Sequence, residues 1–198
     1  RDLHDAVTQT LFSTSLIAEV LPKIWERDSD QAQARLAELR QLTRGALGEM
    51  RTLLMELRPS AMREADPAEL FKHLTEAFTG RTGIPVDLSI EVTENCDPTE
   101  EVKLAFYRIA QEGLNNIGKH AVASQVWFRF RCDEQGATLM ITDDGQGFEL
   151  DAVPRGHLGL GIMQERAESI GGKLALVSQP GEGTTLRLTW RNEQDAIE

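Results

Sequence analysis

The amino-acid sequence predicts an α + α/β protein, in which a helical hairpin over residues 1–62 precedes an α/β sandwich over residues 63–198. Two observations support this fold class. Apolar residues recur three and four apart along residues 3–57, which is helical spacing. Further along the chain, alternating apolar runs and glycine-rich turns indicate strands mixed with helices. A chain of 198 residues is long enough for two small domains.

The first helix of the hairpin is predicted over residues 3–25. Its apolar face is too broad for a single solvated helix, so it must pack against other helices. Pro22 should kink this helix or end it early, because proline has no backbone N–H to donate. The polar stretch that follows predicts a turn, with Ser29 or Asp30 as the N-cap of the next helix.

The second helix is predicted over residues 31–57, ending before Pro59. Its apolar side chains alternate three and four apart, as in the seam of a coiled coil. One hairpin cannot bury both of these apolar faces by itself. We therefore predict a homodimer through residues 1–60, in which two hairpins form a four-helix bundle.

Charge and hydropathy restrict the function. The net charge is -11, and residues 66–198 hold 12 lysines and arginines against 22 aspartates and glutamates. This balance argues against direct nucleic-acid binding. A phosphate ligand would need backbone N–H groups, a local lysine and a divalent cation. No apolar run approaches the roughly 20 residues that span a bilayer, and there is no signal peptide.

The chain begins at Arg1 without a methionine, which indicates a fragment. We expect this part to be cytoplasmic, and the full-length protein can be membrane-anchored through segments upstream of Arg1. Cys96 and Cys132 lack CxxC spacing. They predict buried or incidental thiols in a reducing compartment rather than a metal or redox site.

A compact chemical set lies at the start of the first helix, where His4 and Asp5 are followed by Gln9. A neutral imidazole is a good nucleophile, and a carboxylate on one ring nitrogen raises the basicity of the other. Taken alone, a His-Asp pair on a helix is more often a solvated or capping pair than a catalytic one.

The second part predicts a mixed series of elements. We expect helices over residues 66–80, 99–120 and 161–170, and strands over residues 86–92, 125–131, 138–142, 173–177 and 185–190. Asp66 and Thr99 are the predicted N-caps. Neither a strand–helix–strand repeat nor a GxxxxGK(S/T) loop is present, which disfavours the Rossmann and P-loop folds.

Polar side chains gather in a first cluster, residues 111–120. Glu112, Asn116 and Lys119 are four and three apart, so they share one face of the predicted helix. A carboxylate, an amide oxygen and an ammonium group could together hold Mg²⁺ and phosphate. Ordinary pairing of side chains on the surface is the alternative.

Three further clusters, residues 143–148, 156–161 and 181–185, are rich in glycine. In the first, Asp143 could accept a hydrogen bond from the amine of a base, while the glycines allow the backbone to approach closely. A hairpin or a calcium loop is the alternative. The second runs into a helix, whose free N–H groups suit an anion. The third alone indicates only a turn.

Together and in this order, the four clusters resemble the N, G1, G2 and terminal Gly-Thr boxes of the GHKL ATPases, whose domain is the Bergerat α/β sandwich. The resemblance implies ATP and Mg²⁺ as cofactors and residues 148–158 as a mobile lid. It implies that Asn116 and Glu112 lie at the metal and Lys119 near the phosphates, with Asp143 on the adenine amino group. It also implies ATP-binding roles for four glycines and a threonine: Gly145, Gly147, Gly159, Gly161 and Thr184.

The hairpin narrows the resemblance. A His-Asp-x-x-x-Gln motif before such a domain is similar to sensor histidine kinases, and the Leu57-Arg58-Pro59 and Met163–Ala167 stretches resemble the subfamily that partners NarL-type response regulators. The resemblance implies ATP-dependent autophosphorylation on His4, oriented by Asp5, and phosphotransfer to an aspartate of the regulator. Gln9 would serve removal of phosphate from the regulator, and Glu112 would tune the attack or support Mg²⁺.

Two other classes of function stay open at this point. One is a GHKL ATPase or protein-serine kinase that uses the hairpin only to dimerise. The other is a dimeric scaffold that binds nucleotide as a switch.

Overall fold

The chain divides into two compact units, and each is described by itself. The first unit comprises residues 1–61 and 73–83, and the second comprises residues 62–72 and 84–198. The computed structural model describes residues 2–40, 43, 66–149 and 158–192, with side chains described from residue 14 onward. The boundary predicted after residue 62 lies outside the described residues.

Helix α1 (Asp2–Trp25) forms the start of the first unit. Pro22 lies inside this helix, so of the two predicted effects, a kink or an early end, the early end is wrong. The proline carbonyl still accepts a hydrogen bond from the backbone N–H of Glu26 at 3.3 Å, which lets the chain complete one more turn. Of the described residues, no helix is long and apolar enough to cross a membrane.

A second helix of this unit covers residues 29–40 and includes residue 43; the rest of its predicted range lies outside the described residues. The Asp28 carboxylate caps it by accepting from the backbone N–H groups of Asp30 and Gln31, at 3.1 and 3.0 Å. The predicted caps Ser29 and Asp30 are therefore wrong by one or two residues.

Apolar side chains remain open on both helices of the first unit. Between 37% and 51% of the surface of four of them is exposed: Leu16, Val20, Trp25 and Leu36. Single exposed apolar residues are normal in folded proteins, but a series of them along two helices indicates an interaction surface.

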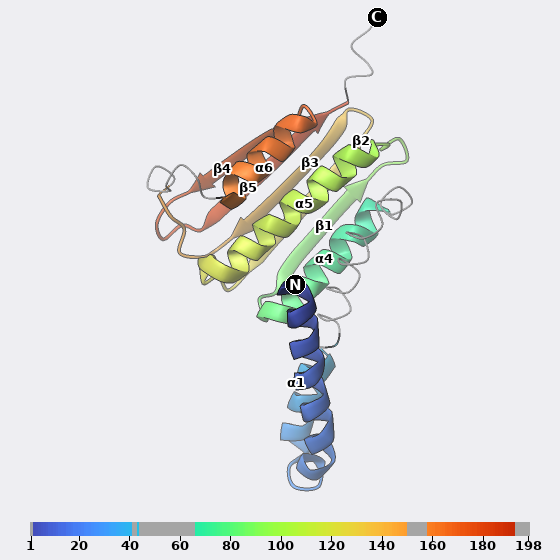
Figure 1. Ribbon diagram of the computed structural model, residues 1–198, viewed down its shortest axis with the longest axis vertical. Helices are drawn as coiled ribbons and strands as arrows, with labels where there is room; N and C mark the ends of the chain where they lie inside the picture. The colour runs from blue at the N-terminus through green and yellow to red at the C-terminus, as the bar shows by residue number, and fades with distance from the viewer. Residues whose placement is uncertain (1, 41–42, 44–65, 150–157, 193–198) are drawn as a thin grey trace, which may run out of the picture. The chain divides into compact units, whose positions relative to one another are not determined.

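The second unit is built on one five-stranded sheet (Figure 1). Its strands are β1 (Val86–Val92), β2 (Val126–Asp133), β3 (Gly136–Asp143), β4 (Lys173–Ser178) and β5 (Thr184–Arg191). They lie in the order β1-β2-β3-β5-β4, with β1 parallel to β2 and all other neighbours antiparallel. Each predicted strand is confirmed to within three residues at either end.

Helices α5 (Glu100–Asn116) and α6 (Leu158–Ser169) lie across one face of this sheet (Figure 1). α5 contacts β3, and α6 contacts β4. β2 alternates as a strand with one covered face should, because Val126, Phe128 and Phe130 are buried between more exposed neighbours. The apolar side chains of the two helices and the covered face form the core.

Helix α4 (Pro67–Thr82) begins in the second unit and adds to this core. The Phe71 ring lies against those of Phe128 and Phe130, with centroids 5.3 and 4.6 Å apart. The predicted N-caps are confirmed. Asp66 accepts from the Ala68 N–H at 2.9 Å, and Thr99 accepts from the Val102 N–H at 3.4 Å at the start of α5.

The end of α5 differs from the sequence prediction of a regular helix to residue 120. After Asn116 the chain continues as a π-helix, Ile117–Ala121, and ends at Val122 in the left-handed region with φ of 53°. A β-branched residue rarely adopts this conformation. The wider turn and the strained residue show that contacts from elsewhere in the fold override the local preference for a regular helix.

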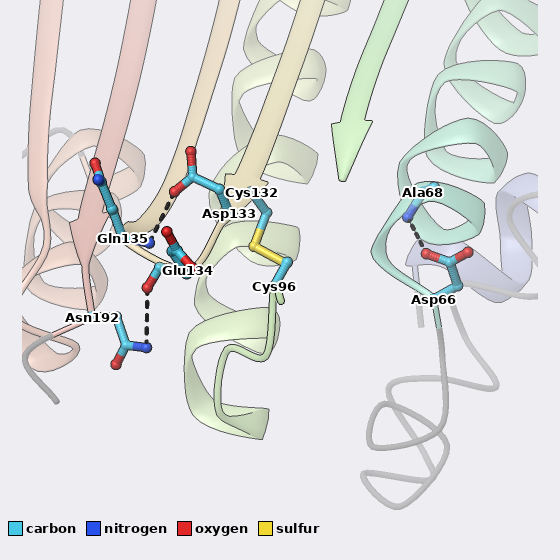
Figure 2. The surroundings of a disulfide bond; sticks show 8 residues. All are labelled: Asp66, Ala68, Cys96, Cys132, Asp133, Glu134, Gln135 and Asn192. Carbon is cyan, nitrogen blue, oxygen red and sulfur yellow. Dashed lines mark hydrogen bonds between the residues drawn. A yellow bond between two sulfur atoms is a disulfide. The ribbon is translucent and has the colours of Figure 1, made fainter. Parts of the chain in front are cut away.

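The two cysteines are paired, so the prediction of unpaired thiols is wrong. Cys96 and Cys132 form a disulfide with their Cα atoms 5.4 Å apart (Figure 2). The parallel pairing of β1 with β2 explains the contact. It places Val92 beside Cys132, and the Thr93 N–H then donates to the Cys132 carbonyl at 3.0 Å, which leads the chain back toward the buried Cys132 side chain.

Candidate functional site

A cavity of about 530 Å³ opens between the end of α5, the end of β3 and the start of α6. All four predicted clusters contribute to its wall. The residues that line it are Glu112, Gly113, Asn116, Ile117, Lys119, His120, Ala121, Ile141, Asp143, Gln146, Gly147, Phe148, Gly159, Leu160, Met163, Leu176, Thr184 and Leu186. The volume and the mixture of apolar walls with a few polar groups suit a small organic ligand.

The polar side of the cavity comes from α5 and the π-helix. Glu112 and Asn116 lie one helical turn apart, so both reach the cavity, and Lys119 follows from the π-helix. Among the described residues that line the cavity, Lys119 is the only lysine or arginine. The cavity therefore brings a carboxylate, an amide and one ammonium group together, as the helical spacing predicted.

A buried carboxylate lies at the other side, at the end of β3. Asp143 is only 2% exposed, and its carboxylate accepts from the Gly145 N–H at 2.9 Å. Burial raises the pKa of Asp143 above its ordinary value, and the hydrogen bond from Gly145 opposes that rise in part. A ligand that donates a hydrogen bond here would stabilise the ionised form.

The glycines beside Asp143 are required by close backbone contacts. A Cβ on Gly147 would lie 1.9 Å from the Gln179 carbonyl oxygen, and one on Gly183 would lie 2.0 Å from that of Asp143. Both residues also have positive φ, at 57° and 75°. Gly145 does not line the cavity; its missing Cβ instead admits the Ala121 carbonyl oxygen, 2.3 Å from where that Cβ would be.

The described part of the 156–161 cluster, residues 158–161, lies in the first turn of α6, because this helix begins at Leu158 and not at residue 161 as predicted. Gly159 lines the cavity and Gly161 does not. A Cβ on Gly159 would lie 2.5 Å from Oε1 of Glu112, so the missing side chain lets this carboxylate approach the start of the helix. The free N–H groups of a first turn attract such a charge.

Hydroxyl groups connect the last cluster to the rest of the site. Ser178 Oγ lies 3.0 Å from Thr184 Oγ1 and donates to the Gly183 carbonyl at 3.1 Å. It also accepts from the Phe148 N–H at 2.9 Å. Ser178 was not among the predicted site residues, because it follows an ordinary strand pattern and reaches the site only through the β4–β5 pairing.

Comparison with known proteins identifies the two parts. A family model described as "Histidine kinase" matches residues 1–62. A second, described as "Histidine kinase-, DNA gyrase B-, and HSP90-like ATPase", matches residues 101–194. The chain belongs to the histidine kinases. A domain of this family implies ATP binding.

Individual relatives agree with this family. The chain is 30% identical over 187 residues to the signal transduction histidine-protein kinase/phosphatase DegS of Brevibacillus brevis, covering 94% of this chain and 48% of that protein. It is 31% identical over 188 residues to the sensor histidine kinase LiaS of Bacillus subtilis, covering 95% and 51%. The chain thus spans about half the length of these curated relatives.

The fold agrees as well. The histidine kinase domain of the Erythrobacter litoralis EL346 blue-light activated histidine kinase matches with a TM-score of 0.54 at 20% sequence identity, covering 89% of this chain and 93% of that one. The likeness at this identity supports the fold alone.

The histidine of the kinase motif lies in the other unit. His4, Asp5 and Gln9 belong to α1, within its first three turns, and their side chains lie outside the described part of the structure. The lid predicted over residues 148–158 also lies largely outside it.

The oxygen donors of the cavity fit Mg²⁺ bound together with phosphates. In the described part of the chain, no three His, Cys, Asp or Glu residues form a metal-binding group. Mg²⁺ in nucleotide sites needs only one or two protein oxygens, because phosphates and waters supply the others. Glu112 and Asn116 present a carboxylate and an amide oxygen to the same cavity, which is sufficient.

Proposed function

We propose that this chain is the catalytic core of a sensor histidine kinase that phosphorylates His4 with Mg-ATP and passes the phosphoryl group to an aspartate of a NarL-type response regulator. The observation that carries the proposal is the convergence of Asp143, Asn116 and Lys119 on one cavity. A base-binding carboxylate, a metal-binding amide and a phosphate-binding ammonium group are what ATP requires.

Each side of the cavity takes one part of the nucleotide. Asp143 accepts a hydrogen bond from the adenine amino group, and Gly147 and Thr184 line that end, while Gly145 acts indirectly by giving room to the Ala121 carbonyl behind it. Lys119 lies near the phosphates. The first turn of α6, with Gly159 and Gly161, presents backbone N–H groups beneath them.

A magnesium ion bound by Asn116 and Glu112 would neutralise phosphate charge in this strongly acidic chain. We expect ATP to bind more weakly when EDTA replaces Mg²⁺ in a calorimetric titration. The Asn116→Ala variant should lose most of this difference. Equal affinity with and without the metal would contradict the assignment.

In the phosphorylation step, a ring nitrogen of His4 attacks the γ-phosphorus, the bond from phosphorus to the β,γ-bridging oxygen breaks, and ADP leaves with that oxygen. Asp5 orients the ring and accepts its proton. The phosphoryl group then moves to an aspartate carboxylate of the regulator, which regenerates His4. Gln9 positions water for the reverse activity, and DegS, whose name includes phosphatase, is a relative of the same family.

Dimerisation through residues 1–60 is part of the proposal. The exposed apolar side chains of the first unit, Leu16, Val20, Trp25 and Leu36, support it because a second hairpin would cover them. Sedimentation at micromolar concentration should give a dimer, and Leu16→Glu combined with Val20→Glu should give a monomer. A strict monomer for the unmodified chain would contradict this.

Labelled ATP tests the reaction itself. The wild-type chain should acquire γ-phosphate label that is lost in acid, as phosphohistidine is, whereas a serine kinase would give acid-stable label. His4→Gln should abolish the label while ADP affinity stays unchanged. Gln9→Ala should keep autophosphorylation and lose dephosphorylation of the regulator. Label that survives on His4→Gln would refute the assignment.

The regulator is identified by phosphotransfer. Phosphorylated chain incubated with a panel of regulators should transfer its label fastest to a NarL-type member. Preferential transfer to a regulator of another type would contradict that part of the proposal and leave the autophosphorylation result standing.

A further inference from the structure

The connection from α5 to β2, residues 117–125, carries Lys119 and His120 into the cavity. It is an irregular stretch. After the π-helix it passes through Val122, which is 85% exposed and has a φ of 53°. Lys119 and His120 are also exposed, so burial of their own side chains does not hold this connection in place.

One of its anchors is Asp144, in the loop after β3. The Asp144 carboxylate accepts from the backbone N–H groups of Ser124 and Gln125 at 2.8 and 2.9 Å, and also from the Ser124 hydroxyl. The Asp144 N–H donates to the Gln125 carbonyl at 3.3 Å. The hydrogen bond from the Ser124 hydroxyl is the main cause that lowers the pKa of Asp144, so this carboxyl is ionised near neutral pH.

The other anchor is Gln146, two residues further on. Its side-chain Nε2 donates to the His120 carbonyl at 2.7 Å, and its backbone N–H donates to the Ala121 carbonyl at 2.7 Å. Its own carbonyl accepts from the Gly181 N–H at 2.6 Å. Gln146 therefore ties the end of the π-helix to the turn that precedes β5.

Other residues hold the side chains at the adenine end of the cavity. Asp143 is held by β3 and by the Gly145 N–H, and Thr184 is held by Ser178. Asp144 does not line the cavity, whereas Gln146 does, and the side-chain amide of Gln146 donates to the His120 carbonyl. The two anchors thus act on the connection, which is the phosphate side of the site.

We propose that Asp144 and Gln146 are positioning residues, which hold the α5–β2 connection so that Lys119 and His120 face the phosphates of bound nucleotide. The inference rests on the nucleotide site of the proposed function. If the anchors are lost, Lys119 and His120 sample many positions, and binding a phosphate must then order them again. Adenosine, which has no phosphate, does not require that ordering.

The experiment compares adenosine, ADP and ATP on the whole chain, with dissociation constants from calorimetry or NMR titration. Asp144→Ala removes three accepted hydrogen bonds, and Asp144→Asn is its matched control because an asparagine can accept from both N–H groups and donate to the Ser124 hydroxyl. Gln146→Met removes the Nε2 group that donates to the His120 carbonyl and keeps the size of the side chain nearly constant. Gln164→Met is its control, since Gln164 is exposed, makes one hydrogen bond to Glu168 and does not line the cavity.

Asp144→Ala and Gln146→Met should each weaken ADP and ATP binding by roughly fivefold to tenfold, the effect of about one hydrogen bond, and change adenosine binding by less than about twofold. Asp144→Asn and Gln164→Met should behave as wild type. The double variant should lose less than the product of the single effects, because both anchors hold one segment.

Equal weakening of adenosine and ADP would overturn the inference, since it would show a general loss of structure. No weakening in either variant would overturn it as well. If Asp144→Ala does not fold, Gln146→Met tests the inference alone, because the Gln146 side chain is exposed and its replacement should leave the fold intact. A wild-type chain that binds none of the three ligands would refute the proposed nucleotide site itself, and is distinguishable from failure of the two anchors alone.

Discussion

The disulfide between Cys96 and Cys132 should contribute a large part of the stability of the second unit. The bond closes a loop with a sequence separation of 36 residues. In the chain-entropy description, closing a loop of this length removes enough freedom from the unfolded state to stabilise the fold by about 4 kcal/mol. For a unit of this size, its loss corresponds to a fall in melting temperature of roughly 10–15 °C.

Cys96→Ser is the preferred perturbation, because Cys96 is partly exposed whereas Cys132 is 1% exposed and packs in the core. The free energy of unfolding is measured in urea for wild type, for wild type with dithiothreitol and for Cys96→Ser. The last two should lose the same amount. A thiol assay that finds two free cysteines without reductant, or an unchanged urea midpoint after reduction, would refute the reasoning.

Four further outcomes follow from the site. Gly147→Ala should destabilise the fold by roughly 2–3 kcal/mol in urea titrations, because its Cβ would lie 1.9 Å from a carbonyl oxygen. Gly161→Ala should stabilise α6 by roughly 0.5–1 kcal/mol in the same assay, because its Cβ would meet nothing within 4 Å. Val122→Gly should stabilise by roughly 0.5–1 kcal/mol by relieving the left-handed conformation, again from the urea midpoint; a loss would contradict this. ADP affinity should fall on acidification at a higher pH than for an ordinary aspartate, because the pKa of Asp143 is raised and only its ionised form accepts fully; calorimetry across pH on wild type and Asp143→Asn, which should lack this titration, checks it.

The sequence predicted best those elements whose signals are local. β1 agrees with its predicted range of residues 86–92, because the alternation of apolar and polar residues that predicts a strand is a local signal. The starts of α4 and α5 agree because a cap acts within three residues of its own position, as Asp66 and Thr99 do. The cap of the second helix also acts over this short range, since the Asp28 carboxylate accepts from the Gln31 N–H, although the predicted caps were Ser29 and Asp30.

Features determined by distant residues could not be predicted in this way. The end of the π-helix accepts a hydrogen bond from Gln146, 26 residues later in the chain, and the connection after it is held by Asp144, 19 residues after Gln125. The disulfide depends on the parallel pairing of β1 with β2, which no local pattern of cysteines reveals. Whether the bond persists depends on the compartment, because disulfides are rare where thiols are kept reduced.

The candidate site also combines residues with a local sequence signal and residues whose role depends on distant parts of the chain. Glu112, Asn116, Lys119 and Asp143 could be proposed from spacing and order, and the structure brings all four to one cavity. Ser178 carried no sequence signal, since a serine at the end of a strand is common and its role depends on which strand lies beside it. The roles of the residues toward ATP stay predictions until they are tested.

Charge decides how a phosphate can enter a site of this kind. The chain carries a net charge of -11, and Lys119 is the only lysine or arginine among the described residues of the cavity wall. The start of α6 would normally attract the phosphate, but the Glu112 carboxylate already approaches it through the space left by Gly159. An incoming phosphate therefore meets a like charge at its best anion site. Mg²⁺ held by Glu112 and Asn116 would neutralise this like charge, which is why the proposed function depends on Mg²⁺ as well as on the lysine and the helix.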